Sequence, residues 1–240
     1  MGGIFQTVRN WGKNVWNSVK QTVAETCELI GSGVRMVGEK IKELGEWIKP
    51  KPVLPDIYVP TQKEEKIIAD SGKFLQEKFP NGIEYAAKNA SIEDRKRSIN
   101  EIIRGGCEIF GIDYNQLDVN IESLDGKTCG AYNWRNRKLT INENMIVSND
   151  PTLFEEQIYT VFHELTHAAQ FEALSAYAND RPFEQYGYTE EQLYLFAQNW
   201  PDVGVYITAP YEDYIKQPVE AYAFGRENRI KLNYNNLINA

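Results

Sequence analysis

Near the start of the chain, apolar residues follow a single helical stripe. They recur at steps of three or four from Ile4 to Ile48, which places them on one face of an α-helix. Gly31 and Gly33 interrupt the stripe and indicate a turn between two helices. The pattern predicts an amphipathic helical segment over residues 1–49. This segment either packs on the rest of the protein or on itself, or it has a docking, delivery or regulatory role in which residues 1–48 bind a partner or a membrane surface.

Prolines separate this segment from the rest of the chain. Pro50, Pro52, Pro55 and Pro60 cannot lie inside a helix, and they stiffen the chain toward an extended form. A stretch of this composition is typical of a domain boundary. The sequence therefore predicts a linker over residues 50–60 and a separate domain over residues 61–240.

Downstream, helical and extended patterns follow one another. Helical spacing and end signals predict four helices, which span Gln62 to about Lys78, Ser91 (the N-cap) to about Ile109, Thr189–Gln198 and Pro218 to about Ile230. A further helix opens at Pro151. Alternating and β-branched positions predict strands at Leu117–Leu124, Ala131–Trp134 and Lys138–Asn142. We expect an α+β fold, mostly helical, with a small sheet next to the helix that begins at Pro151.

Charge sets the N-terminal segment apart and limits the partners. Residues 1–52 hold eight Lys and Arg against five Asp and Glu, a net charge of +3, while the rest hold 18 against 29, a net charge of −11. This asymmetry suggests that the two parts do different jobs. With a total of −8 and no evident basic face, nucleic acid is not expected as a partner.

The sequence predicts neither an ordinary secretory signal nor a disulfide framework. The first residues lack a basic region followed by an uninterrupted apolar run, and no run is apolar enough to cross a bilayer. We expect synthesis in the cytoplasm, with export by a non-classical or specialised route as the alternative. Cys27, Cys107 and Cys129 are few and widely spaced, which is typical of reduced packing residues.

The chain has only two histidines, and both lie in the segment His163-Glu164-Leu-Thr-His167. On a helix, residues four apart share a face, so both imidazoles can bind one ion, and Glu164 lies beside a water on that ion. This H-E-x-x-H pattern predicts a catalytic zinc site. The alternatives are a histidine pair without metal and a zinc site that is structural or has lost activity, although structural sites usually recruit cysteine.

A catalytic zinc ion needs a third protein ligand, and no third histidine exists to supply it. The best candidate is Glu220, near the start of the helix that Pro218 opens. Its alternative role is a helix-start charge favoured by the helix dipole. Glu212 and Asp213 are the reserve candidates.

The motif, followed downstream by the Glu-x-x-Ala pattern at Glu220, resembles the gluzincin branch of the zincin metallopeptidases, and most of all its small bacterial and phage-type members. The resemblance covers about residues 117–230. It implies His163, His167 and Glu220 as zinc ligands and Glu164 as the general base. It also implies a strand lining the substrate cleft, for which Lys138–Asn144 has the right place. Thermolysin-like gluzincins have Asp four residues after the third ligand, whereas this chain has Phe224.

These observations predict a zinc-dependent metallopeptidase with one zinc ion per chain and a protein or peptide substrate. Glu164 would take a proton from a zinc-activated water and pass it to the leaving amine. Tyr211 and Tyr214 are candidates to stabilise the oxyanion. The edge of the 138–142 strand would bind the substrate backbone by strand addition.

Two other functions fit the sequence. The first is a non-enzymatic interaction protein or membrane-active effector that acts through its N-terminal helices and keeps a vestigial zinc site. The second is a zinc hydrolase that acts on a bond other than a peptide bond. The modular layout also suits a toxin or effector that carries a peptidase.

Overall fold

The computed structural model of the chain describes residues 58, 60–125, 128–199, 206–208 and 210–239. The predicted helical segment over residues 1–49 lies outside the described residues, as does Cys27. Of the predicted linker, only Tyr58 and Pro60 are described. All other described residues belong to the region predicted as the separate domain.

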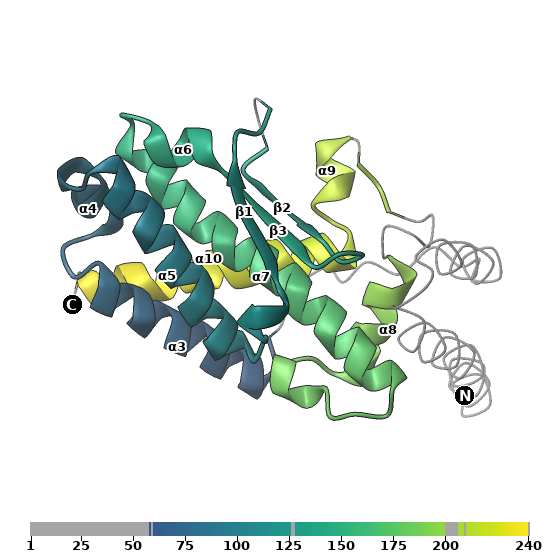
Figure 1. Cartoon of the computed structure of the whole chain (residues 1–240). Coiled ribbons are helices and arrows are strands. Elements are labelled where there is room, and N and C mark those ends of the chain that lie inside the picture. Colours follow the sequence, from purple (N-terminus) through teal and green to yellow (C-terminus); the bar gives the residue numbers. More distant parts are fainter. Residues whose placement is uncertain (1–57, 59, 126–127, 200–205, 209, 240) are drawn as a thin grey trace, which may run out of the picture.

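The domain is built around one long helix, α7 (Pro151–Ala178), which carries the H-E-x-x-H motif. Figure 1 shows α7 running through the middle of the domain, with other helices around it and a small sheet along it. The surrounding helices are α3 (Gln62–Lys78), α4 (Ile83–Asn89), α5 (Ile92–Phe110), α6 (Glu143–Val147), α8 (Glu190–Gln198), α9 (Tyr211–Tyr214) and α10 (Pro218–Ile238), with two short 3-10 helices, η1 (Tyr114–Gln116) and η2 (Glu184–Tyr186).

Side-chain caps fix where several helices begin. The side chains of Thr61, Ser91 and Asp150 accept hydrogen bonds from backbone N–H groups in the first turns of α3, α5 and α7. Thr189 forms a reciprocal capping box with Gln192 at the start of α8. Such caps satisfy N–H groups that have no partner inside the helix, which confirms the predicted starts of these helices.

Two glycines let helix α5 approach its neighbours closely. A Cβ atom on Gly106 would lie 2.5 Å from Cδ1 of Leu165 on α7, and one on Gly105 would lie 2.3 Å from the ring of Phe74 on α3. The helix runs on through both glycines and ends at Gly111, whose φ of 73° suits a left-handed cap. The glycine pair is therefore a packing feature of α5.

The sheet has three strands: β1 (Asp118–Glu122), β2 (Gly130–Asn133) and β3 (Lys138–Asn142). Their order is β1-β3-β2, with β3 parallel to β1 and antiparallel to β2. The central strand β3 is thus paired on both sides. The prediction that its edge binds a substrate backbone was wrong, because the strand order places β2 at the edge of the sheet.

Strand β2 lies along the motif helix α7. At its start, a Cβ atom on Gly130 would come within 2.8 Å of Cγ2 of Thr160 and 3.2 Å of Cγ of Glu164. Just past its end, the rings of Trp134 and Phe171 pack with centroids 5.7 Å apart. The edge strand of the sheet therefore borders the face of α7 that carries the motif.

The predicted fold class is confirmed at the level of architecture. The described chain is mostly helical, and its small mixed sheet contacts the motif helix. The core lies between α7 and helices α3, α5 and α10, and it includes the buried thiol of Cys107. None of the helices within the described ranges combines the length and the apolar character needed to span a membrane.

Candidate metal centre

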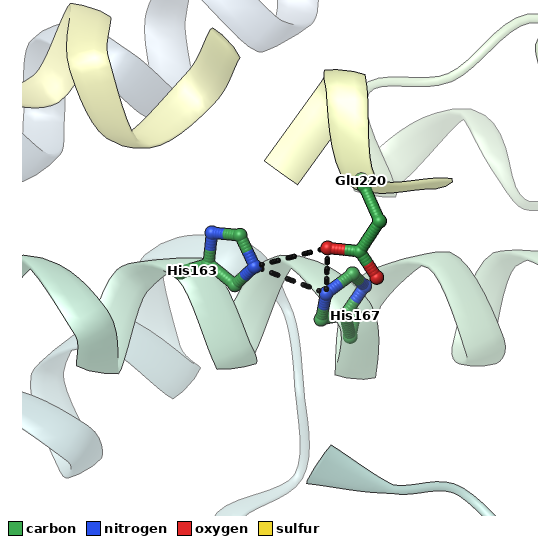
Figure 2. Close-up of side chains that lie close together, drawn as sticks. All are labelled: His163, His167 and Glu220. Carbon is green, nitrogen blue, oxygen red and sulfur yellow. Dashed lines mark hydrogen bonds and ion pairs between the residues drawn. The ribbon is translucent and has the colours of Figure 1, made fainter. Parts of the chain in front are cut away.

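The two histidines project from one face of α7, one turn apart. Figure 2 shows their rings turned toward each other below Glu220. The Nε2 atoms of His163 and His167 lie 3.2 Å apart. Both side chains are largely buried, with 8% and 14% of their surface exposed. As predicted from the spacing of four residues, the two imidazoles thus lie on one face of the helix, close enough to share one ion.

The third member of the cluster is Glu220, which lies in the first turn of α10. Its Oε2 atom is 3.4 Å from Nε2 of His163 and 3.5 Å from Nε2 of His167. The carboxylate is buried, and Oε2 has no hydrogen-bond partner among the described residues. The reserve candidates Glu212 and Asp213 are instead exposed on α9, outside this cluster.

The three ligand atoms are spaced as a zinc ion requires. Bonds of about 2.0–2.1 Å at tetrahedral angles separate the ligand atoms of a zinc ion by about 3.3–3.4 Å. The three distances observed between Nε2 of His163, Nε2 of His167 and Oε2 of Glu220 are 3.2, 3.4 and 3.5 Å. Two imidazoles and one carboxylate are also a ligand set of catalytic zinc sites. The residues present therefore fit this ion, and they can hold a metal.

Electrostatics in the cluster favour a positive charge at its centre. Burial would raise the pKa of Glu220, but the two histidines hold it far below its usual value. Burial would lower the pKa of His163, but its contacts with the carboxylates of Glu220 and Glu227 raise it to about 10. Burial would lower the pKa of His167 as well, but the charge of Glu220, the contact with its carboxylate and the charge of Glu164 together raise it. The buried carboxylate of Glu220 thus favours positive charge beside it, as a bound cation would supply.

The outer nitrogen of each histidine has its own partner. Nδ1 of His163 lies 3.0 Å from Oε2 of Glu227 on α10. Nδ1 of His167 lies 2.9 Å from Oε1 of Gln170 on α7, and the amide of Gln170 donates to the backbone oxygen of Val219. These contacts leave both Nε2 atoms facing the centre, as metal binding requires.

A cavity of about 170 Å³ opens beside the cluster. It is lined by the start of β2, the motif helix, α9 and the first turn of α10, with Gly130, Ala131, Tyr132, Glu164, His167, Tyr206, Tyr214, Val219 and Glu220. Glu164 thus faces the cavity beside two of the ligand residues. Burial raises the pKa of its carboxyl group, which suits a group that must both accept and release a proton.

Tyrosines border the site on the side of α9. The hydroxyl of Tyr206 donates a hydrogen bond of 2.6 Å to Oε1 of Glu220, and Tyr214 lines the same cavity. Burial, followed by the charge of Glu220, raises the pKa of both phenols. Tyr211 stacks on Tyr214 but is exposed, and it does not line the cavity. Of the two predicted tyrosines, the structure therefore brings only Tyr214 to the site.

Gln217, the N-cap of α10, ties this tyrosine-bearing segment to the site. Its buried amide oxygen accepts hydrogen bonds from the side chain of Asn199 and the backbone N–H of Ile207. Its amide nitrogen donates to the backbone oxygens of Ile207 and Tyr214. The Gln217 side chain thus holds Ile207, the residue after Tyr206, and Tyr214, the last residue of α9, next to the start of α10.

Several residues of the site had not been predicted from the sequence. Helical spacing could have indicated Gln170, three residues after His167, and Glu227, two turns after Glu220. Tyr206 lies in an irregular segment, and Gln217 acts through its amide. No local pattern identifies either of these two residues.

In comparisons with protein families, curated proteins and solved structures, nothing matches this chain. The resemblance to gluzincins therefore depends on the H-E-x-x-H motif and on the Glu-x-x-Ala pattern.

Proposed function

We propose that this chain is a zinc-dependent metallopeptidase of the gluzincin type. The observation that carries the proposal is the near-equilateral arrangement of His163, His167 and Glu220 beside a cavity that Glu164 also lines. A structural zinc site closes all four positions, usually with cysteine. In the described part of the chain, the cluster holds three ligand residues and no thiolate, and it borders a cavity.

The protein groups have distinct tasks in this proposal. When bound, the zinc ion supplies Lewis acidity and lowers the pKa of a water molecule. Glu164 takes the proton of the attacking water and passes it to the leaving amine. Tyr214 lines the same cavity and is the donor to the substrate carbonyl oxygen as it becomes negative, whereas the hydroxyl of Tyr206 already donates to Glu220.

The edge strand β2 offers a place for the substrate backbone. Ala131 and Asn133 are exposed and Gly130 and Tyr132 are half-buried, and Gly130, Ala131 and Tyr132 line the cavity. Among the described strands, β2 pairs only with β3 and lies at the edge of the sheet. An extended peptide can therefore add to its free side, which brings a peptide bond over Glu164 and His167.

Metal analysis and one isosteric substitution test the proposal. Purified wild-type protein should contain one zinc ion per chain, and His163→Ala should lose it. Glu164→Gln should keep the zinc but hydrolyse a peptide library about 10²–10⁴-fold more slowly. Glu212→Gln, which changes an exposed carboxylate on α9, is the matched control and should cleave at the wild-type rate.

Other results would contradict the proposal. Full zinc occupancy in His163→Ala would show that His163 is not a zinc ligand. Cleavage by Glu164→Gln at the wild-type rate would show that Glu164 is not the general base. Zinc binding without cleavage of any peptide in the library would favour a vestigial site, or a hydrolase that acts on another bond.

A further inference from the structure

Among the described residues, Glu227 is the one whose carboxylate contacts the outer nitrogen of a histidine in the cluster. Its Oε2 atom lies 3.0 Å from Nδ1 of His163, and the carboxylate is partly buried, with 23% of the side chain exposed. A carboxylate accepts hydrogen bonds, so this contact places a proton on Nδ1. The lone pair of Nε2 is then left for the metal, toward the centre of the cluster.

The position of Glu227 explains how this site works with Phe224 where thermolysin-like gluzincins have Asp. Residues 220, 224 and 227 lie on one face of α10, over two helical turns. The ring of Phe224 packs against the ring of His163, with centroids 4.5 Å apart. Helical side chains lean toward the N-terminus, so Glu227 can reach back from the next turn to His163.

The second histidine is held differently. The Nδ1 partner of His167 is the neutral amide of Gln170, whose NH₂ group also donates to the backbone oxygen of Val219, one residue before Glu220. An amide is needed there because it must accept and donate at once. The two histidines thus have unequal partners, a carboxylate for His163 and an amide for His167.

We propose that Glu227 is a positioning residue that fixes the ring orientation and tautomer of His163 and raises its basicity as a metal ligand. The proposal rests on the proposed zinc site. Its physical basis is the hydrogen bond from a metal-binding imidazole to a carboxylate, whose removal typically costs about 10–100-fold in metal affinity. Asp at this position would be one methylene too short to reach Nδ1.

Zinc affinity measured by chelator competition on the full-length chain tests the proposal. Glu227→Ala and Glu227→Asp should bind zinc about 10–100-fold more weakly than the wild type. Glu227→Gln keeps a hydrogen-bond acceptor but loses the charge, so its zinc affinity should fall by less than that of Glu227→Ala. The control is Glu156→Gln, which removes an exposed carboxylate from α7, seven residues or about 10 Å along the helix from His163.

Proton NMR of the zinc-loaded protein adds a readout that general destabilisation would not move. The chain has only two histidines, so two imidazole N–H resonances are expected. The one bonded to a carboxylate should lie further downfield. Glu227→Gln should shift that resonance alone, while Glu156→Gln should shift neither.

The outcomes separate this proposal from the one on which it rests. If the wild type does not bind zinc, both proposals fall. If the wild type binds zinc but Glu227→Ala and Glu227→Asp match it in affinity, only the role of Glu227 is overturned. The same holds if Glu156→Gln weakens binding as much as Glu227→Gln, because the effect would then be one of charge at a distance.

Discussion

Two clusters of buried charged side chains meet helix α10, and they differ in the arrangement of their charges. The first is the candidate metal centre at Glu220. The second, which we call the rear cluster, consists of Tyr58, Glu64 and Arg226. Glu220 and Arg226 are six residues apart, so they project from different faces of the helix.

The rear cluster is a closed ion pair. Nε of Arg226 donates to Oε1 of Glu64 at 2.8 Å, and both side chains are fully buried. The hydroxyl of Tyr58 donates to the same oxygen at 2.6 Å. The guanidinium lies between two aromatic rings, 5.1 Å from the centroid of Phe110 and 4.8 Å from that of Tyr188. Each charge in this cluster has an opposite charge as its partner.

The candidate metal centre and the rear cluster differ in how their charged groups are placed, not in whether polar atoms lack partners. Both clusters leave buried polar atoms without a partner among the described residues, including Oε2 of Glu64, Nη1 of Arg226 and Oε2 of Glu220. Unpaired atoms alone therefore do not mark a site. What sets the metal centre apart is that three groups able to bind a cation converge at zinc-like distances beside a cavity.

The largest expected effect comes from breaking the rear cluster. Arg226→Ala would leave the carboxylate of Glu64 buried without its counter-charge, which should lower the free energy of unfolding by about 3–5 kcal/mol. The control is Arg229→Ala. Arg229 is also on α10, is half-exposed and pairs with Glu65 on α3. This substitution should cost about 0–1 kcal/mol in urea unfolding.

The same experiment probes how the rear cluster supports the metal centre. Arg226 and Glu64 tie α10 to α3, and α10 carries Glu220 and Glu227. We expect Arg226→Ala to keep its zinc under conditions where it stays folded, because it contacts none of the ligands. Equal costs for Arg226→Ala and Arg229→Ala would show that the rear cluster is not a structural ion pair.

A truncation gives the next largest effect. We expect residues 61–240 to fold and bind zinc without residues 1–48, since the described core lies in this part of the chain. Tyr58, however, packs against the domain: a Cβ atom on Gly225 would lie 2.4 Å from its ring, and Tyr222 lies edge-on at 5.1 Å. Removing Tyr58 should cost about 1–3 kcal/mol.

Two truncations isolate this contribution. A chain that begins at residue 56 keeps Tyr58, whereas one that begins at residue 61 loses it. Urea unfolding should show the shorter chain to be less stable, with both chains binding one zinc ion. An insoluble or metal-free chain from residue 56 would show instead that residues before it cover part of the core.

Local sequence patterns predicted five of the helices, the three strands and the residues of the cluster that could hold a metal. They did not predict the short helices α4, α6 and α9 or how the elements are arranged. Caps such as Ser91 and Asp150 act within one helical turn, and the spacing of His163 and His167 is likewise local. The order of the strands depends on contacts across the chain, so β3 was wrongly expected at an edge. Tyr206 reaches Glu220 across an irregular segment, which no periodicity describes.

The smallest expected effect concerns a feature that the two clusters share. In each, a tyrosine hydroxyl donates a 2.6 Å hydrogen bond to a buried carboxylate: Tyr58 to Glu64 and Tyr206 to Glu220. In metal-free protein, Tyr58→Phe and Tyr206→Phe should each cost about 0.5–1.5 kcal/mol of unfolding free energy. Tyr211→Phe, which changes an exposed ring outside the cavity, should cost less than about 0.5 kcal/mol.

Zinc should then separate the two tyrosines. A bound cation neutralises Glu220, so the carboxylate depends less on the hydroxyl of Tyr206, and the cost of Tyr206→Phe should fall when zinc is added. The rear cluster has no such ligand, because Arg226 already supplies the positive charge to Glu64. The cost of Tyr58→Phe should therefore be the same with and without zinc. Thermal unfolding of both variants in the two states measures this, and equal zinc dependence would contradict the distinction between an open cation site and a closed ion pair.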